Sequence, residues 1–380
     1  MLIQPLSELF NDKVLAENIT ACFQCGACTA ACPLNIFNGP KLSPRQFLRK
    51  MQLGLPVDID PYLCMMCRAC ESVCPRNVKV TKVIHELRRI WFKNNRAPAP
   101  LTQALWKIYE DGNPWGYPFR TRGQWLDKLD ANIAKKRSDT LLYIGCISSY
   151  DIRLQRIATA IVKLLLKTGV DFTVLGDEEK CCGDPVFHAG ETDFLEELVN
   201  ENIAKFNSLG IRKIVTISPH CYTMFRDIYP KYGGEYETLH YTEYLAELLD
   251  AGKLSIDARL EARTTYHDPC YLGRYAKIYE QPRRLIESVK GLSFYEMSFS
   301  KELSLCCGGG GGRILMESKP EERPSNIRVK QAVETGAEIL ITSCPYCIIN
   351  FEDSAKIQKT PLKVMDVAEL LQAAVGGQDG

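Results

Sequence analysis

The hydrophobic and polar positions divide the chain into a helical N-terminal part and a C-terminal part in which strands alternate with helices. Near the N-terminus, Ser43-Pro44-Arg45 precedes Gln46–Gln52 with the cap and proline that often start a helix. Thr81–Lys93 has the apolar periodicity of a second helix. We therefore expect a small all-helical domain over residues 1–95.

From residue 139 onward, short apolar runs alternate with longer amphipathic ones. The first such unit predicts strands at Thr140–Ile144, Val170–Leu175 and Ile214–Ile217, and helices at Gln155–Thr168 and Phe194–Ser208. Later in the chain, Glu338–Ser343 is also predicted as a strand. Strands that alternate with helices indicate parallel sheets covered by helices. Ligands of such sheets bind at the carboxyl ends of the strands.

The C-terminal part contains an internal repeat. The pairs that match are Cys146 with Cys270, Cys181-Cys182-Gly183 with Cys306-Cys307-Gly308, and Ser218-Pro-His-Cys221 with Cys344-Pro-Tyr-Cys347. These pairs are 124 to 126 positions apart. Ala246-Glu-Leu-Leu249 also matches Ala368-Glu-Leu-Leu371. Matches in this order indicate a duplicated module, with copies at residues 139–254 and 255–380.

Residues 96–138 connect the two parts. Arg96-Ala-Pro-Ala-Pro100 is typical of an extended linker. Leu101–Asp111 is predicted as a helix and Gly112-Asn-Pro-Trp-Gly116 as a turn. We expect this segment to dock one domain on another. The alternative is that it forms a contact surface for the metal sites or for a partner protein.

Composition and charge argue against several classes of protein. A formal net charge of +1 over 380 residues argues against nucleic-acid binding. Met1–Asn18 carries three acidic residues and lacks the apolar core of a secretory signal. No run approaches the roughly 18 apolar residues of a membrane span. We therefore expect a cytoplasmic protein, peripheral on the cytoplasmic face of a membrane only through a partner subunit.

The 17 cysteines form four groups with none left over. An odd number argues against a complete disulfide framework, and cytoplasmic thiols stay reduced, so these groups indicate metal. The first two groups are Cys22, Cys25, Cys28 and Cys32, followed by Pro33, and Cys64, Cys67, Cys70 and Cys74, followed by Pro75. The other two are Cys146, Cys181, Cys182 and Cys221, and Cys270, Cys306, Cys307, Cys344 and Cys347.

The first two groups share the spacing C-x2-C-x2-C-x3-C-P of two-cluster ferredoxins, in which the fourth cysteine ligates the other cluster. One cubane 4Fe–4S cluster is therefore expected on Cys22, Cys25, Cys28 and Cys74. The second is expected on Cys64, Cys67, Cys70 and Cys32. Two zinc sites are the alternative, although zinc ligands usually come in two pairs separated by a longer stretch.

The second copy of the module has five cysteines where a cubane needs four, which indicates an unusual cluster or a thiol that bridges two irons. Gly308–Gly312 follows Cys306-Cys307 directly. A phosphate-binding loop is one interpretation, but no Lys-Ser or Lys-Thr follows it and no GxGxxG lies at a strand end. The stronger interpretation is that Gly308 and Gly309 let the backbone approach the cluster closely and leave an opening for substrate.

Cys270…Cys306-Cys307-Gly308…Cys344-Pro-Tyr-Cys347 resembles the CCG motif of the heterodisulfide reductase catalytic subunit. The N-terminal half is similar to that family's two-cubane subunit, and the resemblance covers residues 18–372. It implies an α-helical ferredoxin domain fused to an α/β domain of two duplicated parallel-sheet CCG modules. It also implies a noncubane 4Fe–4S cluster, at which a disulfide is cleaved, on Cys270, Cys306, Cys307, Cys344 and Cys347.

Two positions leave alternatives open. His267, three residues before Cys270, could deliver a proton or make a structural hydrogen bond. In the first copy, Ser218 stands where the second has Cys344. The remaining thiols of Cys146, Cys181, Cys182 and Cys221 then bind a further cluster of a different kind or form a vestigial site. Iron–sulfur subunits of glycolate, lactate and glycerol-3-phosphate oxidation are similar in having lost this ligand.

The leading hypothesis is a subunit that carries electrons from a partner through both cubanes to the noncubane cluster, which reduces a small-molecule or protein disulfide or oxidises a dithiol. The alternative is an electron-transfer subunit of a flavin dehydrogenase that feeds quinone or a membrane cytochrome. A redox-sensing scaffold is a third interpretation, which the five-cysteine module argues against. The sequence has no flavin, nicotinamide or Cys-x-x-Cys-His haem motif. We therefore expect the donor or acceptor on another subunit, a flavoprotein or a cytochrome b-like membrane protein.

Overall fold

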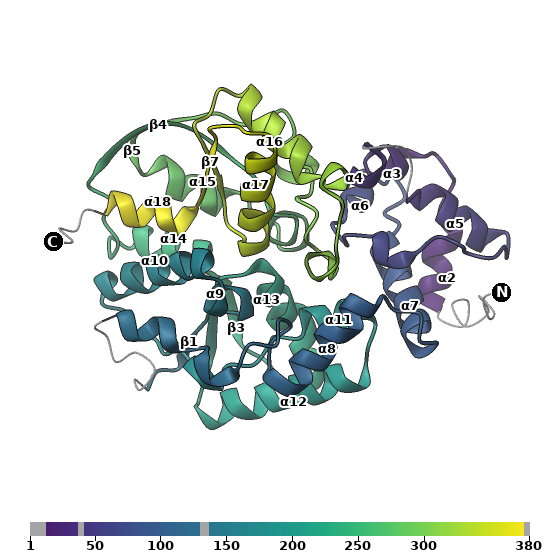
Figure 1. Ribbon diagram of the computed structural model, residues 1–380, viewed down its shortest axis with the longest axis horizontal. Helices are drawn as coiled ribbons and strands as arrows, with labels where there is room; N and C mark the ends of the chain where they lie inside the picture. Colours follow the sequence, from purple (N-terminus) through teal and green to yellow (C-terminus); the bar gives the residue numbers. More distant parts are fainter. Residues whose placement is uncertain (1–12, 37–41, 130–136, 376–380) are drawn as a thin grey trace.

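The computed structural model describes residues 13–36, 42–129 and 137–375 (Figure 1). Three units pack together. A helical unit lies at one end of the molecule, and two α/β modules lie beside each other at the other end. The predicted N-terminal domain includes residues 1–12, the connecting segment includes residues 130–136, and the second module includes residues 376–380. These three ranges lie outside the described residues.

The described part of the N-terminal unit consists of helices and turns. Its elements are α2 (Lys13–Thr20), α3 (Ala27–Ala30), α4 (Pro33–Ile36), α5 (Pro44–Gln52), the 3-10 turn η1 (Pro61–Leu63), α6 (Ala69–Ser72) and α7 (Val80–Lys93). Helix α5 begins where the sequence predicts, because the Ser43 hydroxyl accepts the Gln46 N–H at 3.3 Å. Apolar side chains of α5 and α7 form the core of this unit.

The connecting segment packs against the first module. Helix α8 (Ala99–Asp111) ends at Gly112, and the 3-10 turns η2 (Phe119–Thr121) and η3 (Gln124–Lys128) follow. Leu105 and Ile108 of α8 belong to the apolar core of the first module. This segment therefore lies against the module over much of its described length.

Each module contains a parallel sheet. The first has the order β1-β2-β3, formed by Thr140–Tyr143, Lys213–Thr216 and Glu237–His240. The second has the order β5-β4-β6-β7, formed by Lys290–Phe294, Arg259–Tyr266, Ile339–Thr342 and Lys363–Asp366. The predicted strand at Val170–Leu175 is wrong in extent. Only Thr173 pairs there, as a single bridge to Leu141, because the chain turns into a 3-10 helix at Gly176.

Helices cover both sheets. Those of the first module are α9 (Cys146–Tyr150), α10 (Ile152–Thr168), α11 (Asp184–Ala189), α12 (Asp193–Ser208), α13 (Pro219–Thr223) and α14 (Tyr241–Asp250). Those of the second are α15 (Glu280–Glu287), α16 (Ser325–Glu334), α17 (Pro345–Ile357) and α18 (Val367–Ala374). The single bridge at Thr173 takes the place of β5, so both modules follow one topology. This architecture confirms the predicted fold class.

Equivalent helix caps fix the register of the duplication. His240 and Asp366 each end the last strand of their module and cap the following helix, in capping boxes with Glu243 and Glu369. Positions 240 and 366 differ by 126, as do 218 and 344. The predicted match of Ala246-Glu-Leu-Leu249 with Ala368-Glu-Leu-Leu371 is therefore wrong by one helical turn, because its shift is 122.

The two modules contact each other through helices. Figure 1 shows α10 beside α18, and α14 packs against α15. Arg153 of α10 donates to Glu352 and Glu369 of the second module at 2.6 Å each. The hydroxyl of Tyr241 donates to Asp366 at 2.6 Å. Partly buried ion pairs and one buried hydrogen bond thus join the two copies along their shared face.

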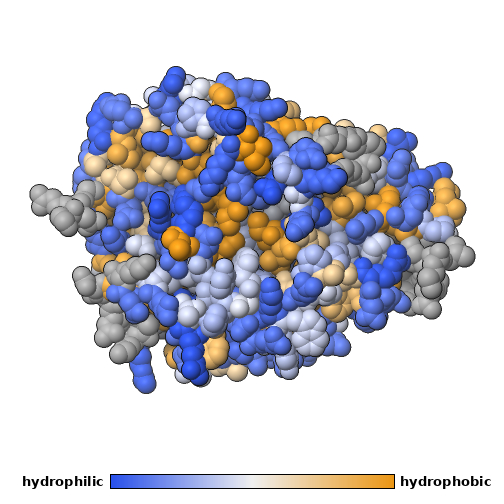
Figure 2. Space-filling view, viewed as in Figure 1, coloured by the Kyte–Doolittle hydropathy of each residue, from blue (hydrophilic) through white to orange (hydrophobic). Residues whose placement is uncertain are grey.

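The visible surface of the molecule is largely hydrophilic, with smaller hydrophobic areas between the charged side chains (Figure 2). Among the described residues, no helix has both the length and the apolar content needed to cross a membrane.

Candidate metal centres

The two ferredoxin-like loops, residues 22–32 and 64–74, have the same backbone shape. Gln24 and Met66 lie in the left-handed region at φ 67° and 51°, and Gly26 and Arg68 do so at 87° and 58°. Both pairs are 42 residues apart, which is the distance between the two cysteine runs. A left-handed conformation costs a non-glycine residue about 1–2 kcal/mol. Three such residues in two short loops therefore indicate a shape imposed by what the loops enclose.

A small cavity lies inside each loop. The residues that line the first include Cys22, Cys25, Cys28 and Cys74, and those that line the second include Cys32, Cys64, Cys67 and Cys70. The fourth cysteine of each run therefore lines the cavity of the other run. In the part of the chain that the structure describes, no three Cys, His, Asp or Glu side chains form a site for a single metal ion.

The chemistry of these sulfurs fits an iron–sulfur cluster in each loop. Burial raises the pKa of Cys32 to about 12, and the neighbouring Cys67 and Cys64 add to the rise. Such crowded, buried thiols become thiolate ligands only beside a compensating cation. Backbone N–H groups already point at sulfurs, from Met66 to Cys64 at 3.3 Å and from Val78 to Cys74 at 3.4 Å.

The five cysteines of the second module meet at one edge of its sheet. Cys270 follows β4, Cys344 follows β6, and Cys347 lies in the first turn of α17. The sulfur of Cys270 is 3.8 Å from that of Cys306, and the sulfur of Cys347 is 3.3 Å from that of Cys307. The strand order reverses between β4 and β6, which is where open α/β sheets bind ligands.

His267 ends this same strand region and is fully buried. Its Nδ1 accepts the Arg328 Nε–H at 3.1 Å. Burial and the Arg328 guanidinium lower the pKa of His267 well below its usual value, so the ring is neutral with its hydrogen on Nε2. Nε2 has no hydrogen-bond partner among the described residues. These contacts match the structural alternative for His267, and proton delivery stays a prediction.

The glycine run, Gly308–Gly312, contacts the second ferredoxin-like loop. A Cβ atom on Gly310 would lie 2.6 Å from the carbonyl oxygen of Met65, and one on Gly311 would lie 2.8 Å from that of Cys64. Glycine is therefore required here for the approach of two domains. The approach at Gly310 and Gly311 is thus to the neighbouring domain, and the predicted approach of this segment to a cluster stays a prediction.

A larger cavity opens onto Cys307. It has a volume of about 780 Å³, and Gly308 and Gly309 line it beside Cys307 and Asn350. The Asn350 amide donates to the Cys307 carbonyl at 3.2 Å. Gly308 and Gly309 thus line a cavity, and their role at an opening for substrate stays a prediction.

The four cysteines of the first module are all buried. The Gly183 N–H points at the Cys181 sulfur at 3.4 Å, as the Gly308 N–H points at that of Cys306 at 3.3 Å. Ser218, which replaces the fifth thiol, accepts the N–H of His220 at 3.3 Å and begins α13. The serine is therefore a helix cap in this module.

Arg122 of the connecting segment faces the first-module site. Its two terminal nitrogens each lie 3.6 Å from the Cys146 sulfur, and Nη2 donates to Glu179 at 2.5 Å. The Glu179 carboxylate also accepts the N–H groups of Ile144 and Gly145, both at 2.9 Å. The sequence places Arg122 in a segment expected to dock one domain on another or to contact the metal sites, but it does not single out Arg122, because its partners lie 24 and 57 residues away.

His220, the histidine of the Ser-Pro-His-Cys turn, has no role in the sequence prediction. In the structure it contacts Asp184 and Cys344. Burial lowers the pKa of His220, but Asp184 and Cys344 together outweigh burial and raise it to about 10. Burial raises the pKa of Cys344, but hydrogen bonds with Cys347 and His220 outweigh it and lower the value to about 6.

The second ferredoxin-like loop lies directly against the five-cysteine site. Cys67 packs with Cys270 and Cys306 in one buried cluster. Arg274, in the π-helical turn η8 (Tyr271–Tyr275), donates to the Cys67 carbonyl at 2.5 Å. The second cavity and the five-cysteine site are therefore adjacent.

Family models match both parts of the chain. Residues 17–78 match the 4Fe–4S dicluster domain, and residues 140–226 and 264–352 match the cysteine-rich CCG domain. The first match contains both ferredoxin-like runs, so this part of the chain is a 4Fe–4S dicluster domain. The two later matches confirm the duplication.

Several curated proteins are similar to the chain. The probable iron-sulfur-binding oxidoreductase FadF of Bacillus subtilis is 37% identical over 80% of this chain and 44% of its own length. EtfAB:quinone oxidoreductase of Syntrophomonas wolfei is 36% identical over 98% of this chain and 49% of its own length. The chain thus spans about half the length of these two relatives.

A third relative has nearly the same extent as this chain. It is a subunit of the dihydromethanophenazine:CoB–CoM heterodisulfide reductase of Methanosarcina mazei, and it is 30% identical over 94% of both chains. That match includes both the dicluster domain and the duplicated modules. The chain therefore belongs to the same iron–sulfur protein family as this heterodisulfide reductase subunit, a family in which a 4Fe–4S dicluster domain precedes a duplicated CCG domain.

Proposed function

We propose that this chain is the electron-transfer subunit of a heterodisulfide-reductase-like complex and that it reduces a disulfide, or oxidises a dithiol, in its second module. The observation that carries this proposal is the cavity that opens onto Cys307, beside the other four cysteines of that module. The balanced reaction is one disulfide plus two electrons and two protons to two thiols.

The metal sites follow the cysteine groups. In this proposal, Cys22, Cys25, Cys28 and Cys74 hold one cubane, and Cys32, Cys64, Cys67 and Cys70 hold the other. The noncubane cluster is held by Cys270, Cys306, Cys307, Cys344 and Cys347. When bound, that cluster supplies single electrons and Lewis-acidic iron for thiolate binding. Cys146, Cys181, Cys182 and Cys221 are the ligands of a further metal group in the first module.

The order of the sites supports a path from the surface to the cavity. Cys25, beside the first cavity, is exposed, whereas Cys67, beside the second, is buried. The contact between Cys67 and Cys306 then connects the dicluster domain to the second module. Electrons from a partner would therefore enter at the outer end of the dicluster domain.

The surface around the first cavity favours an acidic partner. Residues lining this cavity and the adjoining groove include Arg45, Arg49 and Arg76, and no carboxylate is among the described lining residues. Phe23 is 59% exposed beside them. We propose that the partner, a flavoprotein or a cytochrome b-like subunit, presents acidic side chains around its cofactor, because opposite charges speed the encounter of redox partners.

The cavity at Cys307 favours a small-molecule disulfide over a protein disulfide. Its volume of about 780 Å³ falls in the usual range for small-molecule sites. Arg313, Lys319 and Arg323 line it together with Glu322 and Asp353. This mixture of charges suits a substrate that carries both carboxylate and ammonium groups.

The relatives favour a second candidate function. A protein named EtfAB:quinone oxidoreductase matches 98% of this chain, although the chain spans only half of that protein. In this case the chain would carry electrons between a flavoprotein and a quinone-reducing partner. The second module would then act as a relay, and the cavity at Cys307 would have no disulfide substrate.

Replacement of Cys307 separates the two candidates. We expect Cys307→Ser in the cluster-loaded chain to lower disulfide turnover at least 100-fold, because the substituted sulfur faces the cavity. The electron paramagnetic resonance signals of the two cubanes should stay unchanged and serve as the internal control. In the unmodified chain, a small thiol should alter the signal of the second-module cluster under oxidising conditions. Disulfide turnover that survives the substitution would show that Cys307 is not at the reacting site. A second-module signal that no thiol or disulfide alters would favour the relay function.

A further inference from the structure

One side of helix α17 leads from the five-cysteine site to the cavity that opens onto Cys307. Cys347, Asn350 and Asp353 follow one another at intervals of three residues, so their side chains lie on the same face of this helix. Cys347 is buried, and its sulfur lies 3.3 Å from that of Cys307. Asn350 and Asp353 line the cavity. Asn350 therefore lies between the cysteines and the space available to a substrate.

Asn350 contacts Cys307 through one side-chain atom. Its amide nitrogen donates to the Cys307 carbonyl oxygen at 3.2 Å and lies 3.7 Å from the Cys307 sulfur. A carbonyl oxygen only accepts hydrogen bonds, so the atom that contacts it is the amide nitrogen and not the amide oxygen. This nitrogen carries two hydrogens and does not ionise. The amide is therefore a permanent donor beside the Cys307 sulfur.

We infer that Asn350 is a positioning residue of the second-module site, and that its side-chain amide fixes the Cys307 sulfur at the wall of the cavity. This inference rests on the proposed disulfide chemistry. It deepens that proposal by naming the residue that orients the cysteine lining the cavity.

Gly309 leaves the space that this amide occupies. A Cβ atom on Gly309 would lie 3.0 Å from Asn350 Nδ2 and 3.3 Å from the Cβ atom of Tyr346. The backbone of Gly309 lies outside the left-handed region, so its conformation does not require glycine. The close approach of the Asn350 amide is therefore a reason for glycine at this position.

The first module has an apolar side chain at the equivalent position. Met224 corresponds to Asn350 at the shift of 126 positions that also relates Ser218 to Cys344. Met224 is buried in the apolar core of the first module. Methionine is the better helix former, so an asparagine in the middle of α17 does not serve the helix itself. The amide belongs to the copy in which a cysteine lines the cavity.

The first test is a redox titration of the full cluster-loaded chain, followed by electron paramagnetic resonance. Asn350→Ala removes the amide. We expect it to shift the midpoint potential of the second-module cluster downward, because a hydrogen bond to a ligating sulfur stabilises the more negative reduced state. Both cubane potentials should stay unchanged. Asn207→Ala, which removes an exposed amide from α12, is the control and should shift no potential.

The second test is turnover of cystine, a small disulfide that carries carboxylate and ammonium groups. We expect Asn350→Ala to lower kcat roughly tenfold, the effect of about one hydrogen bond, and to leave KM within about twofold. Gly309→Ala should also lower kcat, because the added Cβ displaces the amide. The double variant should be no slower than Asn350→Ala alone, because both changes act on one contact.

An unshifted second-module potential in Asn350→Ala would overturn the inference. Equal shifts of all clusters would do so as well, because they indicate a general structural role, and so would an effect on KM alone, which indicates substrate binding. Losses that add in the double variant would contradict the link between Gly309 and Asn350. A potential that shifts as expected in a cluster that responds to no thiol or disulfide would support the role of Asn350 and contradict disulfide chemistry. Absence of that cluster from the unmodified chain would overturn both proposals.

Discussion

Arg122 places a buried guanidinium against the cysteines of the first module. Its side chain and that of Glu179 are each only 1% exposed, and they pair with each other. Glu179 also accepts two backbone N–H groups of the turn before Cys146. A buried guanidinium is costly unless it is paired and hydrogen-bonded, and Glu179 supplies that pairing here. Arg122 and Glu179 therefore form one buried pair beside Cys146, and a metal group in the first module stays a proposal.

Arg122→Met tests that site. The substitution leaves the Glu179 carboxylate buried and unpaired, which typically costs about 3–5 kcal/mol of stability. We expect a lower unfolding temperature and the loss of the metal bound by the first module, measured as iron and zinc per chain. Arg120→Met, an exposed position on the same segment, is the matched control. Full metal content in a folded Arg122→Met chain would show that the guanidinium does not support the site.

At the level of elements, the glycine run and the second ferredoxin-like loop form the junction between two domains. Gly311 has φ +62°, and a Cβ there would also lie 2.9 Å from the Met66 side chain. Arg88 joins the run and the loop by donating to carbonyls of both, at Gly311 and Cys64. The distance between the two domains therefore depends on glycine at this position.

Gly311→Ala should push the run away from the loop. We expect slower reduction of the second-module cluster after rapid mixing with a reductant, with cluster contents unchanged. Gly210→Ala is the matched control, because Gly210 has φ +71° but no atom within 4 Å of an added Cβ. Gly210→Ala places alanine in the same left-handed backbone region as Gly311→Ala but creates no steric clash. Equal reduction rates in both variants would show that the close approach does not govern electron transfer.

The sequence predicted the elements that depend on local signals. Helix α5, with its Ser43 cap, and strand β6 lie where periodicity and capping place them. The strand expected at Val170–Leu175 is mostly unpaired, because its pairing depends on the neighbouring strand and not on its own apolar residues. The predicted alignment of the two copies is wrong at residue 246. Successive turns of an amphipathic helix have similar residues, so two such helices also align when one is displaced by a turn.

The site residues show the same difference between local signals, which the sequence reveals, and long-range contacts, which it does not. All 17 cysteines could be grouped from their spacing, since ferredoxin and CCG ligands are close in sequence or repeated. His220 and Asp184 could not be found in this way. Their partners come from distant segments, and only the packing of one module on the other brings His220 to Cys344.

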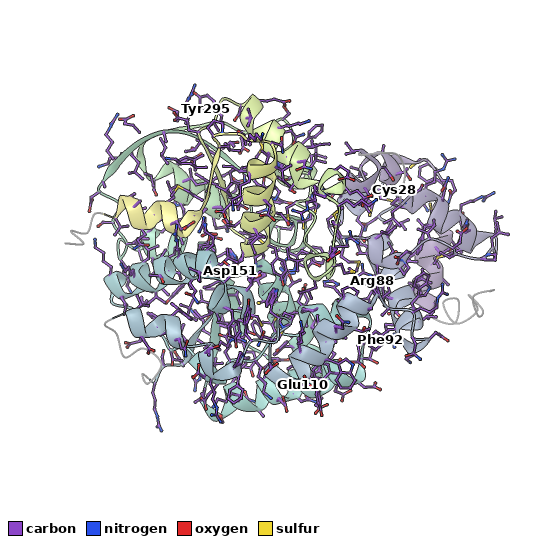
Figure 3. All side chains as sticks on the ribbon, in the orientation of Figure 1. Cys28, Arg88, Phe92, Glu110, Asp151 and Tyr295 are labelled. Carbon is purple, nitrogen blue, oxygen red and sulfur yellow. The ribbon has the colours of Figure 1, made fainter. Side chains whose placement is uncertain are left out.

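At the scale of the whole molecule, Arg88 joins all three units (Figure 3). It is fully buried on α7 and donates to carbonyl oxygens at Pro61, Cys64, His188 and Gly311. These carbonyls belong to the dicluster domain, the first module and the second module. One side chain thus donates hydrogen bonds to carbonyl oxygens that would otherwise be buried without a donor where the three units meet.

Arg88→Met should loosen the assembly of the three units. Each buried carbonyl left without a donor costs about 1–3 kcal/mol. We expect separate unfolding of the dicluster domain before the two modules, detected by calorimetry and by faster proteolysis in the connecting segment. Arg89→Met is the control, because Arg89 pairs with Glu86 on the same helix. A single unfolding transition at the original temperature would contradict this role for Arg88.

Ser218 has a consequence for how the duplicated copies diverge. The Ser218 hydroxyl accepts the N–H of His220 and so caps the helix that carries this histidine. A cysteine at this position would supply a thiol but a weaker hydrogen-bond acceptor for that cap. The position that differs between the two copies therefore affects both the ligand set and the start of α13.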